Sequence, residues 1–252
     1  MSEPYQGPTA LVTGAARRTG RAIAEALASD GYNVLVHYHT SGAQAEELTG
    51  ALRGLGVRSD ALPADLGRPD GAANLIRQVR GLTSRLDLLV NNIGNYPLGP
   101  PLAQPAQAFR DTLETNLVAP YLLIQGLREL LAAAPTGNVV NIGYVGVDHA
   151  VANRHAMSYQ ISKTGLLILT KTLAQELGPA GIRVNMVSPG HLDNSVDLPG
   201  ELRAHVPLGR AGAPAEIAAA IRYLVTDGSY ANGANLELGG GYRLALASRL
   251  DE

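Results

Sequence analysis

Short apolar runs alternate along the chain with longer segments in which apolar residues recur every three or four positions. Runs of the first kind predict buried strands, and segments of the second kind predict amphipathic helices. Because the two alternate throughout, we expect an α/β fold, a doubly wound and mainly parallel sheet of seven strands with helices on both faces. The expected strands are 10–13, 33–38, 58–64, 86–90, 138–142, 182–187 and 235–238. The expected helices are one that contains Ile23, Ala26 and Leu27, and then 44–55, 70–82, 106–134, 157–177 and 214–226.

The segments that lack this pattern predict the boundaries of a single domain and the position of its loops. Residues 1–8 are polar, and we expect them to form a flexible N-terminus. Residues 9–243 would form the domain, and 244–252 a C-terminal tail. Residues 191–207 have poor periodicity and predict a mobile loop over the substrate. The proline-rich stretch before residue 106 predicts another loop, and Pro120 a break in the long helix that follows.

Composition narrows the class of protein. The chain has 252 residues, of which 46% are hydrophobic and 17% charged, as in an ordinary globular domain. Its formal net charge of −2 argues against a nucleic-acid partner. It contains no Cys, so it has neither a disulfide framework nor a thiol nucleophile, and we expect no metal site. No apolar run is long enough to span a bilayer, so we expect no membrane partner and a cytoplasmic location.

A glycine-containing turn follows the first predicted strand. It reads Thr13-Gly14-Ala15-Ala16-Arg17-Arg18-Thr19-Gly20, and an alanine-rich helix follows it. Gly14 allows a tight turn, and Gly20 allows the helix and the strand to pack closely. Backbone N–H groups and the positive end of the helix dipole can hold a pyrophosphate there. The arrangement of strand, turn and helix is the context that a dinucleotide-binding turn needs.

Three further motifs fall near the expected carboxyl ends of strands, where an open α/β sheet builds its site. They are Asn91-Asn92-Ile93-Gly94, Tyr159-Gln160-Ile161-Ser162-Lys163 and Ser188-Pro189-Gly190. Together with the opening turn, they resemble the short-chain dehydrogenase/reductase family, from about residue 9 to about residue 243. The resemblance implies a Rossmann-type fold and hydride transfer between a nicotinamide cofactor and a carbonyl or imine carbon.

The spacing of Tyr159 and Lys163 has a chemical meaning. Residues four apart on a helix share a face. A phenol is a poor proton donor at neutral pH unless its anion is stabilised, which a Lys ammonium one turn away can do. The resemblance implies that Tyr159 is the catalytic acid and that Lys163 also binds the nicotinamide ribose. It further implies that Asn116 holds a water beside the lysine.

Other positions match the cofactor-binding pattern of the family. The resemblance implies that Asp65 and Leu66 contact the adenine and that Asn92 and Gly94 form the turn under the nicotinamide side. It also places Pro189 and Gly190 beside the nicotinamide.

The end of the second strand bears on the choice of cofactor. NAD enzymes usually carry an acid there, but this segment reads His37-Tyr38-His39-Thr40-Ser41. Arg17 in the glycine turn, together with His37, His39 and Ser41, would favour a 2′-phosphate. We therefore predict a preference for NADPH.

Two departures concern the substrate. Arg18 stands where many family members have a second glycine, and in this respect the turn resembles a pteridine reductase-like subset. In that subset the arginine reaches across the pyrophosphate towards the substrate, and an aromatic side chain stacks on the pterin about where Tyr96 lies. The resemblance therefore implies that Arg18 and Tyr96 bind substrate. The alternative for Tyr96 is simple packing on the neighbouring prolines.

The second departure is the absence of the family's catalytic Ser after the fifth strand, where pteridine reductases have Asp. Alignment from the strand puts Gly143 or Tyr144 at that place, and counting back from Tyr159 gives Gly146. Tyr144 is a candidate hydrogen-bond donor to a substrate carbonyl, and Asp148 and His149 are further candidates.

The leading hypothesis is an NADPH-dependent oxidoreductase that reduces a carbonyl compound or a pterin-like C=N compound. The alternative is an NADPH-binding protein that has lost efficient catalysis with the missing Ser. The expected partner is a small-molecule substrate. The resemblance also implies a homo-oligomer, a dimer or a homotetramer, that associates through helices 106–134 and 157–177.

Overall fold

The computed structural model describes residues 5–195 and 206–242, and within them it contains a single parallel sheet of seven strands. The strand order is β3-β2-β1-β4-β5-β6-β7. The strands are β1 (Thr9–Val12), β2 (Asn33–Tyr38), β3 (Ser59–Pro63), β4 (Leu88–Asn91), β5 (Gly137–Ile142), β6 (Ile182–Pro189) and β7 (Asn235–Leu238). All six pairs of neighbouring strands are parallel, which confirms the predicted fold class.

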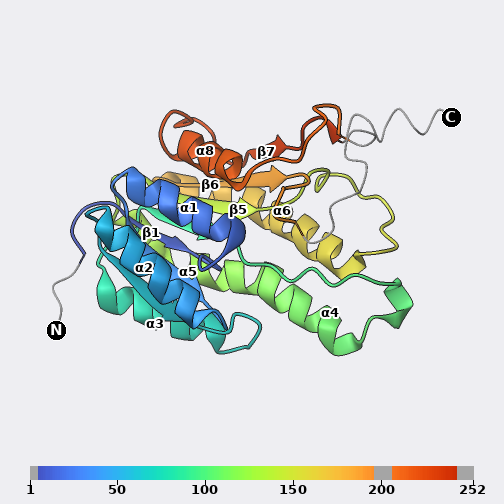
Figure 1. The fold of residues 1–252 in the computed structure, drawn as a ribbon, viewed down its shortest axis with the longest axis horizontal. Coiled ribbons are helices and arrows are strands. Elements are labelled where there is room, and N and C mark those ends of the chain that lie inside the picture. Colours follow the sequence, from blue (N-terminus) through green and yellow to red (C-terminus); the bar gives the residue numbers. More distant parts are fainter. Residues whose placement is uncertain (1–4, 196–205, 243–252) are drawn as a thin grey trace.

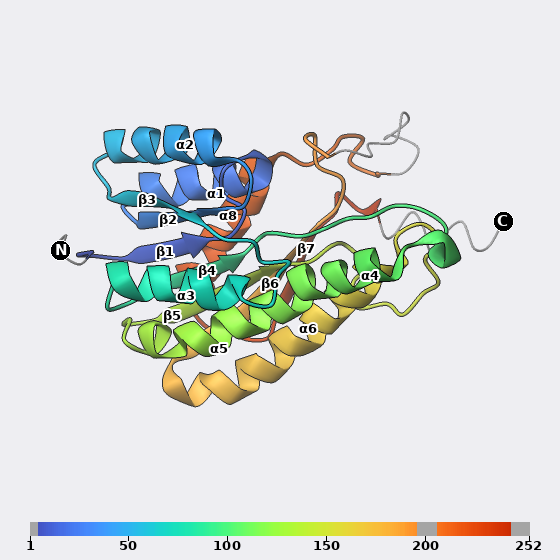
Figure 2. The same ribbon diagram turned by 90° about the horizontal axis from the view of Figure 1, so that it is seen from below.

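Helices cover both faces of this sheet. They are α1 (Arg18–Ser29), α2 (Gly42–Gly54), α3 (Gly71–Leu82), α4 (Ala106–Leu113), α5 (Ala119–Ala132), α6 (Met157–Leu177) and α8 (Pro214–Val225), with short η1 (Pro101–Ala103), η2 (Glu114–Val118) and η3 (Gly178–Ala180). Figures 1 and 2 show α1, α2 and α8 on one face and α3, α5 and α6 on the other. None of the described helices is long and apolar enough to cross a membrane.

A hydrophobic core fills the space between the sheet and each helical layer. One cluster joins β1 and β2 to α1, α2 and α8, and Ile23, Leu48 and Ile221 are among its fully buried members. The other joins the opposite face of the sheet to α3 and α5, with residues such as Leu75 and Leu123. At about 25 cal/mol per Å² of apolar surface, this burial is the main stabilising contribution to the fold. The strand ends that carry the predicted motifs are thereby held rigidly.

The strand order reverses between β1 and β4. The chain runs outward from β1 to β3 and then returns to place β4 on the other side of β1. The carboxyl ends of the strands therefore leave a crevice at this point, which is where open α/β sheets bind ligands. The turn after β1 and the Asn-Asn-Ile-Gly motif after β4 meet there.

The long helix expected over residues 106–134 is three elements. A π-helical turn, η2, separates α4 from α5, and Pro120 lies in the first turn of α5. The break therefore lies just before the proline, which is tolerated in a first helical turn because its missing N–H has no partner there. Single π turns inside helices are frequent at functional sites, and this one contains Asn116.

The flexible N-terminus predicted for residues 1–8 is wrong from residue 5 onwards. Tyr5 is buried, and its hydroxyl donates a hydrogen bond to Asp60. The guanidinium of Arg58 lies 4.3 Å from the centre of its ring. An aromatic ring packed in this way anchors the chain before β1. Residues 1–4, the tail 244–252 and most of the predicted loop 191–207 lie outside the described residues.

Candidate active site

The turn between β1 and α1 is as tight as the two glycines predict. Gly14 has φ +63°, a conformation that favours glycine. A Cβ on Gly20 would overlap the carbonyl oxygen of Gly14 and lie 2.7 Å from Nδ2 of Asn92. That Nδ2 donates to the carbonyls of Thr13 (2.8 Å) and Gly14 (3.3 Å). The side chain of Asn92 therefore holds the turn in place through these two hydrogen bonds. Asn92 is one of the residues predicted to lie under the cofactor.

Two exposed arginines, Arg17 and Arg18, lie at the start of α1, next to this turn. Arg17 is the N-cap residue, and its side chain makes no capping bond. Arg18 has φ +54°, so a residue other than glycine holds the left-handed conformation at this place in the turn. A non-glycine residue in this region carries backbone strain, and such strain collects at functional sites. Both guanidinium groups stand at the positive end of the helix dipole, where an anion is stabilised.

His37 is placed differently from the prediction. It is fully buried in β2, and its ring lies between the turn and the end of β3. Burial lowers its pKa to about 4, so it is neutral at pH 7. The prediction that His37 approaches a 2′-phosphate is therefore wrong, because the ring carries no charge and is not exposed. A sequence shows that a histidine ends a strand but not which side of the strand it faces.

Of the other predicted residues at this end of the sheet, His39 is exposed, Ser41 and Asp65 are half-buried, and Leu66 is buried. His39 is exposed and lies 3.5 Å from the carboxylate of Asp65, whose other oxygen accepts the N–H of Gly67. Ser41 caps the N-terminus of α2 without a side-chain capping bond. A cavity of about 490 Å³ opens beside them. It is lined by His39, Asp65, Leu66, Gly67, Arg68, Pro69, Ile93, Asn95, Gln107, Asp111 and Thr115.

Tyr159 and Lys163 lie on one face of α6, as their spacing predicts. Nζ of Lys163 is 5.8 Å from the centre of the Tyr159 ring and donates to the carbonyl oxygen of Ile142 at 2.7 Å. Lys163 is 3% exposed, and burial lowers its pKa to about 8. The ammonium is therefore charged at neutral pH, but it can lose its proton in mildly basic solution.

Asn116 and Gly94 complete the surroundings of the lysine. A Cβ on Gly94 would lie 3.4 Å from both Nζ of Lys163 and Oδ1 of Asn116. Oδ1 of Asn116 accepts the N–H of Asn95 at 2.7 Å, and Nδ2 donates to Ser162 at 3.0 Å. Asn95 and Ser162 were not among the residues predicted for the site, although both lie inside or beside predicted motifs. The bare backbone of Gly94 leaves room against the lysine.

Gly143 is the first of the candidate positions for the missing Ser, and steric crowding explains why this position carries no side chain. A Cβ on Gly143 would lie 2.5 Å from Oγ of Ser188 and 2.7 Å from Sδ of Met186. Any side chain at this position would therefore collide with β6. Ser188 itself is buried and donates to Asn235, so its hydroxyl is engaged.

Tyr144 follows Gly143 and packs against Tyr159. The centres of the Tyr144 and Tyr159 rings are 5.6 Å apart. The Tyr144 hydroxyl interacts with the side chain of Thr164, and burial raises the pKa of Tyr144. The two further candidates for the carbonyl donor, Asp148 and His149, approach each other to 3.6 Å in the loop that follows.

Tyr96 is a second aromatic residue in contact with Tyr159. Its ring meets that of Tyr159 edge-on, with centres 4.6 Å apart, and it remains 40% exposed. Such edge-to-face pairs are favourable for aromatic rings. Tyr96 therefore lies beside the Tyr159 ring, where a substrate-binding residue is expected.

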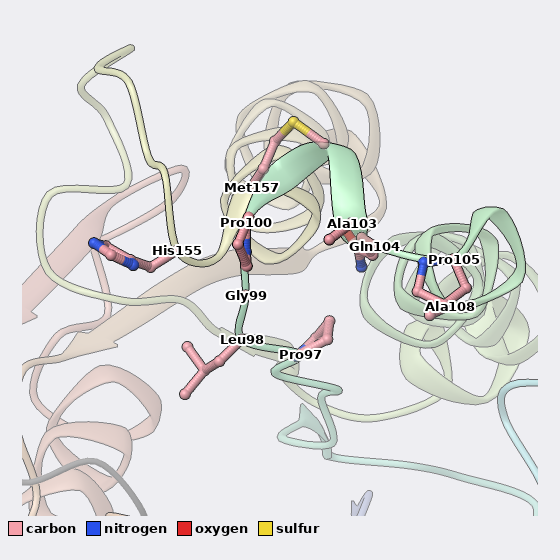
Figure 3. Close-up of a pocket in the computed structure, with 10 residues that line it drawn as sticks. All are labelled: Pro97, Leu98, Gly99, Pro100, Ala103, Gln104, Pro105, Ala108, His155 and Met157. Carbon is pink, nitrogen blue, oxygen red and sulfur yellow. The ribbon is translucent and has the colours of Figure 1, made fainter.

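Beyond Tyr96 a cavity of about 200 Å³ separates the proline-rich loop from the start of α6 (Figure 3). Most of the residues that line it are apolar in type, and His155 lies on one side and Gln104 on the other. Gln104 donates to Ser158, the residue before Tyr159, at 2.7 Å. The lining residues are Pro97, Leu98, Gly99, Pro100, Ala103, Gln104, Pro105, Ala108, His155 and Met157.

Pro189 and Gly190 end β6 beside the strand β7. The N–H of Gly190 donates to the carbonyl of Leu238 at 2.9 Å. A Cβ on Gly190 would lie 2.9 Å from Cα of Gly239, so two backbones approach closely there. Pro189 ends the strand and Gly190 follows it, and their place beside the nicotinamide stays a prediction.

Comparison with known proteins agrees with this geometry. A family model described as enoyl-(acyl carrier protein) reductase matches residues 14–243. The chain belongs to the short-chain dehydrogenase/reductase family. It is 32% identical over 240 residues to the 3-oxoacyl-[acyl-carrier-protein] reductase FabG of Staphylococcus epidermidis, covering 92% of this chain and 98% of that relative.

Solved structures resemble this chain at about the same sequence identity. The landomycin C-6 ketoreductase LanV, with bound NADP and rabelomycin, superposes with a TM-score of 0.85 at 32% identity, covering 95% of this chain and 97% of that chain. A short chain dehydrogenase from Burkholderia cenocepacia in complex with NADP gives a TM-score of 0.87 at 31% identity, covering 96% and 100%. The family and fold predictions are confirmed. None of these three relatives is named a pteridine reductase, so the resemblance to that subset stays a prediction.

Proposed function

We propose that this protein is an NADPH-dependent oxidoreductase that reduces a carbonyl group to an alcohol. The observation that carries the proposal is the buried Lys163, whose ammonium lies 5.8 Å from the Tyr159 ring and faces the bare backbone of Gly94. A buried charge without a carboxylate partner is costly, and such groups concentrate at functional sites.

The residues present fit a dinucleotide. The N-terminus of α1 and the close approach at Gly20 suit a pyrophosphate, and the cavity beside Asp65 and Leu66 suits an adenosine. Gly94 lies next to Lys163 and Asn116 and has no side chain that would separate a ribose from them. When bound, NADPH supplies the hydride.

The chain's own residues supply the proton. The phenol of Tyr159 would donate its proton to the carbonyl oxygen as negative charge develops there. The ammonium of Lys163 stabilises the phenolate that is left. Asn116, held by backbone and Ser162, orients the groups around the lysine.

The preference for NADPH over NADH rests on charge at the end of β2. The segment after this strand contains no acid, while Arg17 and His39 are exposed nearby. Ser41 adds a hydroxyl at the N-terminus of α2. These groups would attract a 2′-phosphate, whereas an NAD site would need a carboxylate there.

The substrate would lie against Tyr96 and Tyr144, with the cavity of Figure 3 beyond them. Aromatic and proline surfaces suit a hydrophobic or flat ketone. The relatives that act on 3-oxoacyl groups and on an angucycline ketone support a carbonyl substrate. A pterin-like C=N compound is the second candidate, favoured by Arg18 at the mouth of the turn and by the edge-on Tyr96.

One observation favours the non-catalytic alternative. The hydroxyl of Tyr144, at the position of the missing Ser, interacts with Thr164. Loss of one positioned donor costs roughly a hundredfold or more in rate. A protein that only binds NADPH, however, has no need of the Tyr159 and Lys163 pair.

The test is NADPH consumption by wild type and Tyr159→Phe with a 3-oxoacyl thioester, a polycyclic aromatic ketone, an α-diketone, a quinone, an aliphatic ketone and a dihydropterin. Turnover of a carbonyl compound that is lost in the variant supports the proposal. Turnover of the dihydropterin alone would move the protein to the pterin candidate. Tight NADPH binding without any turnover would favour the non-catalytic alternative.

We also propose that the protein is a homo-oligomer, a dimer or tetramer, that associates through α5 and α6. Tyr121 on α5 is 40% exposed, and Ile161 and Ile168 on α6 are 46% and 63% exposed. Apolar side chains gathered on two helices suit a second copy of the same surface. Light scattering should give a multiple of 26.3 kDa that Ile168→Glu reduces, and a wild-type monomer would contradict the proposal.

A further inference from the structure

His37 occupies the junction of three segments at the cofactor end of the sheet. It lies in β2, which pairs with β1 on one side and with β3 on the other. Its side chain is fully buried. The turn after β1 and the segment after β3 are the two parts of the chain that would hold the pyrophosphate and the adenosine.

Both ring nitrogens of His37 bind backbone. The N–H of Gly14 donates to Nδ1 at 3.1 Å, and Nε2 lies 3.1 Å from the carbonyl oxygen of Ala64. Because an amide N–H can only donate, Nδ1 must be the acceptor and Nε2 must carry the proton. The hydrogen bonds therefore select one neutral tautomer, which connects the turn to the end of β3.

The backbone of His37 holds the same turn. Its carbonyl oxygen accepts the N–H of Ala15 at 2.9 Å. Two consecutive N–H groups of the turn are thus bound by one residue of β2. On the opposite side, Asn92 binds the carbonyls of Thr13 and Gly14. The turn is fixed between two strands before any ligand arrives.

We propose that His37 is a positioning residue for the cofactor: its Nδ1 holds the Gly14 turn in the geometry that binds the dinucleotide, while the bond from Nε2 to Ala64 only orients the ring, and the side chain does not touch the cofactor. Such preorganisation improves affinity because the turn need not be ordered on binding. The role concerns the pyrophosphate half that NADPH and NADH share. His37 should therefore affect both cofactors equally, whereas a contact to the 2′-phosphate would affect NADPH alone.

Three variants separate the two hydrogen bonds. His37→Asn places an amide oxygen near the position of Nδ1 and keeps an acceptor for Gly14. His37→Gln places an amide nitrogen near the position of Nε2 and keeps a donor for Ala64. His37→Leu keeps neither. His39→Asn, which changes an exposed residue just beyond the same strand, is the matched control for a phosphate contact.

Binding is measured by titrating NADPH and NADH into each protein and following nicotinamide fluorescence, with no substrate present. We expect His37→Asn to bind both cofactors within about threefold of wild type. His37→Gln and His37→Leu should bind both about tenfold or more weakly, since a buried donor loses its acceptor. His39→Asn should weaken NADPH only. With saturating NADPH, kcat of the His37 variants should stay within about threefold.

The proposal is overturned if His37→Leu binds both cofactors like wild type, or if the losses are confined to NADPH. It also fails if His37→Asn binds as weakly as His37→Gln. Should His37→Leu not fold, the comparison of His37→Asn with His37→Gln decides the question alone. The titration needs no turnover, so its failure is distinguishable from the failure of the proposed carbonyl reduction.

Discussion

The surroundings of Lys163 and of His37 both bury a basic side chain at the cofactor end of the sheet, but they use it differently. Burial lowers both pKa values, to about 8 for the lysine and about 4 for the histidine. At pH 7 the lysine is therefore charged and the histidine is neutral. The lysine donates to one backbone carbonyl and lies against the bare backbone of Gly94, while both nitrogens of the histidine are bound to backbone.

The difference separates reaction chemistry from support. A buried charge that keeps an open side can act on a ligand, and a buried neutral ring with both nitrogens engaged can only hold its neighbours in place. Substitutions around Lys163 should therefore change mainly the reaction rate. Substitutions in the cofactor turn should change mainly the cofactor affinity and the stability of the fold. Mutations and changes of pH test this division.

Removal of the lysine charge should have the largest effect. Lys163→Met keeps the length and burial of the side chain but removes the ammonium that stabilises the Tyr159 phenolate. We expect the rate of carbonyl reduction to fall about 1,000-fold, within the range for a lost acid–base group. Steady-state kinetics with saturating NADPH measure it, and Lys171→Met on the same helix is the control. A loss below tenfold would contradict a catalytic role for the lysine.

Acid should destabilise the fold through His37. The unfolded chain takes up a proton near pH 6.5, but the folded chain does so only near pH 4, so stability is lost as the pH falls between these values. We expect wild type to lose about 2 kcal/mol more than His37→Asn between pH 7 and pH 5. Urea unfolding at both pH values measures the free energies. Equal losses in the two proteins would contradict the burial of a neutral ring.

Gly20→Ala tests the close approach in the turn. The added Cβ would overlap the carbonyl of Gly14 and press on Asn92, so the start of α1 must shift. We expect NADPH affinity to fall about 30-fold, equivalent to about 2 kcal/mol. Gly50→Ala is the matched control, because its Cβ meets nothing within 4 Å and alanine favours a helix. Unchanged affinity in Gly20→Ala would place the cofactor elsewhere.

The pH dependence of reduction should follow Lys163. Above a pKa of about 8 the lysine loses its charge, and the support for the phenolate goes with it. We expect kcat/KM for the carbonyl substrate to fall about tenfold per pH unit above pH 8, at saturating NADPH. Lys163→Met should lack this descending limb. A wild-type rate that stays level to pH 10 would show that the lysine charge is not used.

Tyr144→Phe should have the smallest effect. Its hydroxyl interacts with Thr164, so its loss should change the rate less than threefold. Tyr144→Ser is the informative partner, because a small hydroxyl at this place can approach a carbonyl oxygen and should raise the rate. A hundredfold loss in Tyr144→Phe would instead show that Tyr144 donates to the substrate.

The sequence predicts most of the fold because its patterns are local. The bounds of β2, α6 and β7 coincide with the predicted 33–38, 157–177 and 235–238. The break in the long helix lies near Pro120, as predicted, because the proline is tolerated only in the first turn of the helix that follows. The π turn around Asn116, in contrast, depends on its partners Asn95 and Ser162.

The site was predicted unevenly for a similar reason. Tyr159, Lys163, Asn116 and Gly94 meet because their spacing and strand ends determine their faces. The predicted contact of His37 with a 2′-phosphate is wrong. The side of β2 on which the His37 ring is buried depends on the segment after β3, which the local sequence does not show. The direction of the Tyr144 hydroxyl likewise depends on Thr164, which only the packed structure brings near.

The most direct test of the central claim follows the transferred hydrogen. NADPH deuterated on the transferred position of its nicotinamide is incubated with the best carbonyl substrate and with wild type or Tyr159→Phe, and the alcohol is analysed by mass spectrometry. The account predicts one deuterium on the former carbonyl carbon with wild type. It also predicts at least about 1,000-fold less alcohol with the variant, which should still bind NADPH. Equal amounts of deuterated alcohol from both proteins, or alcohol without deuterium, would contradict it.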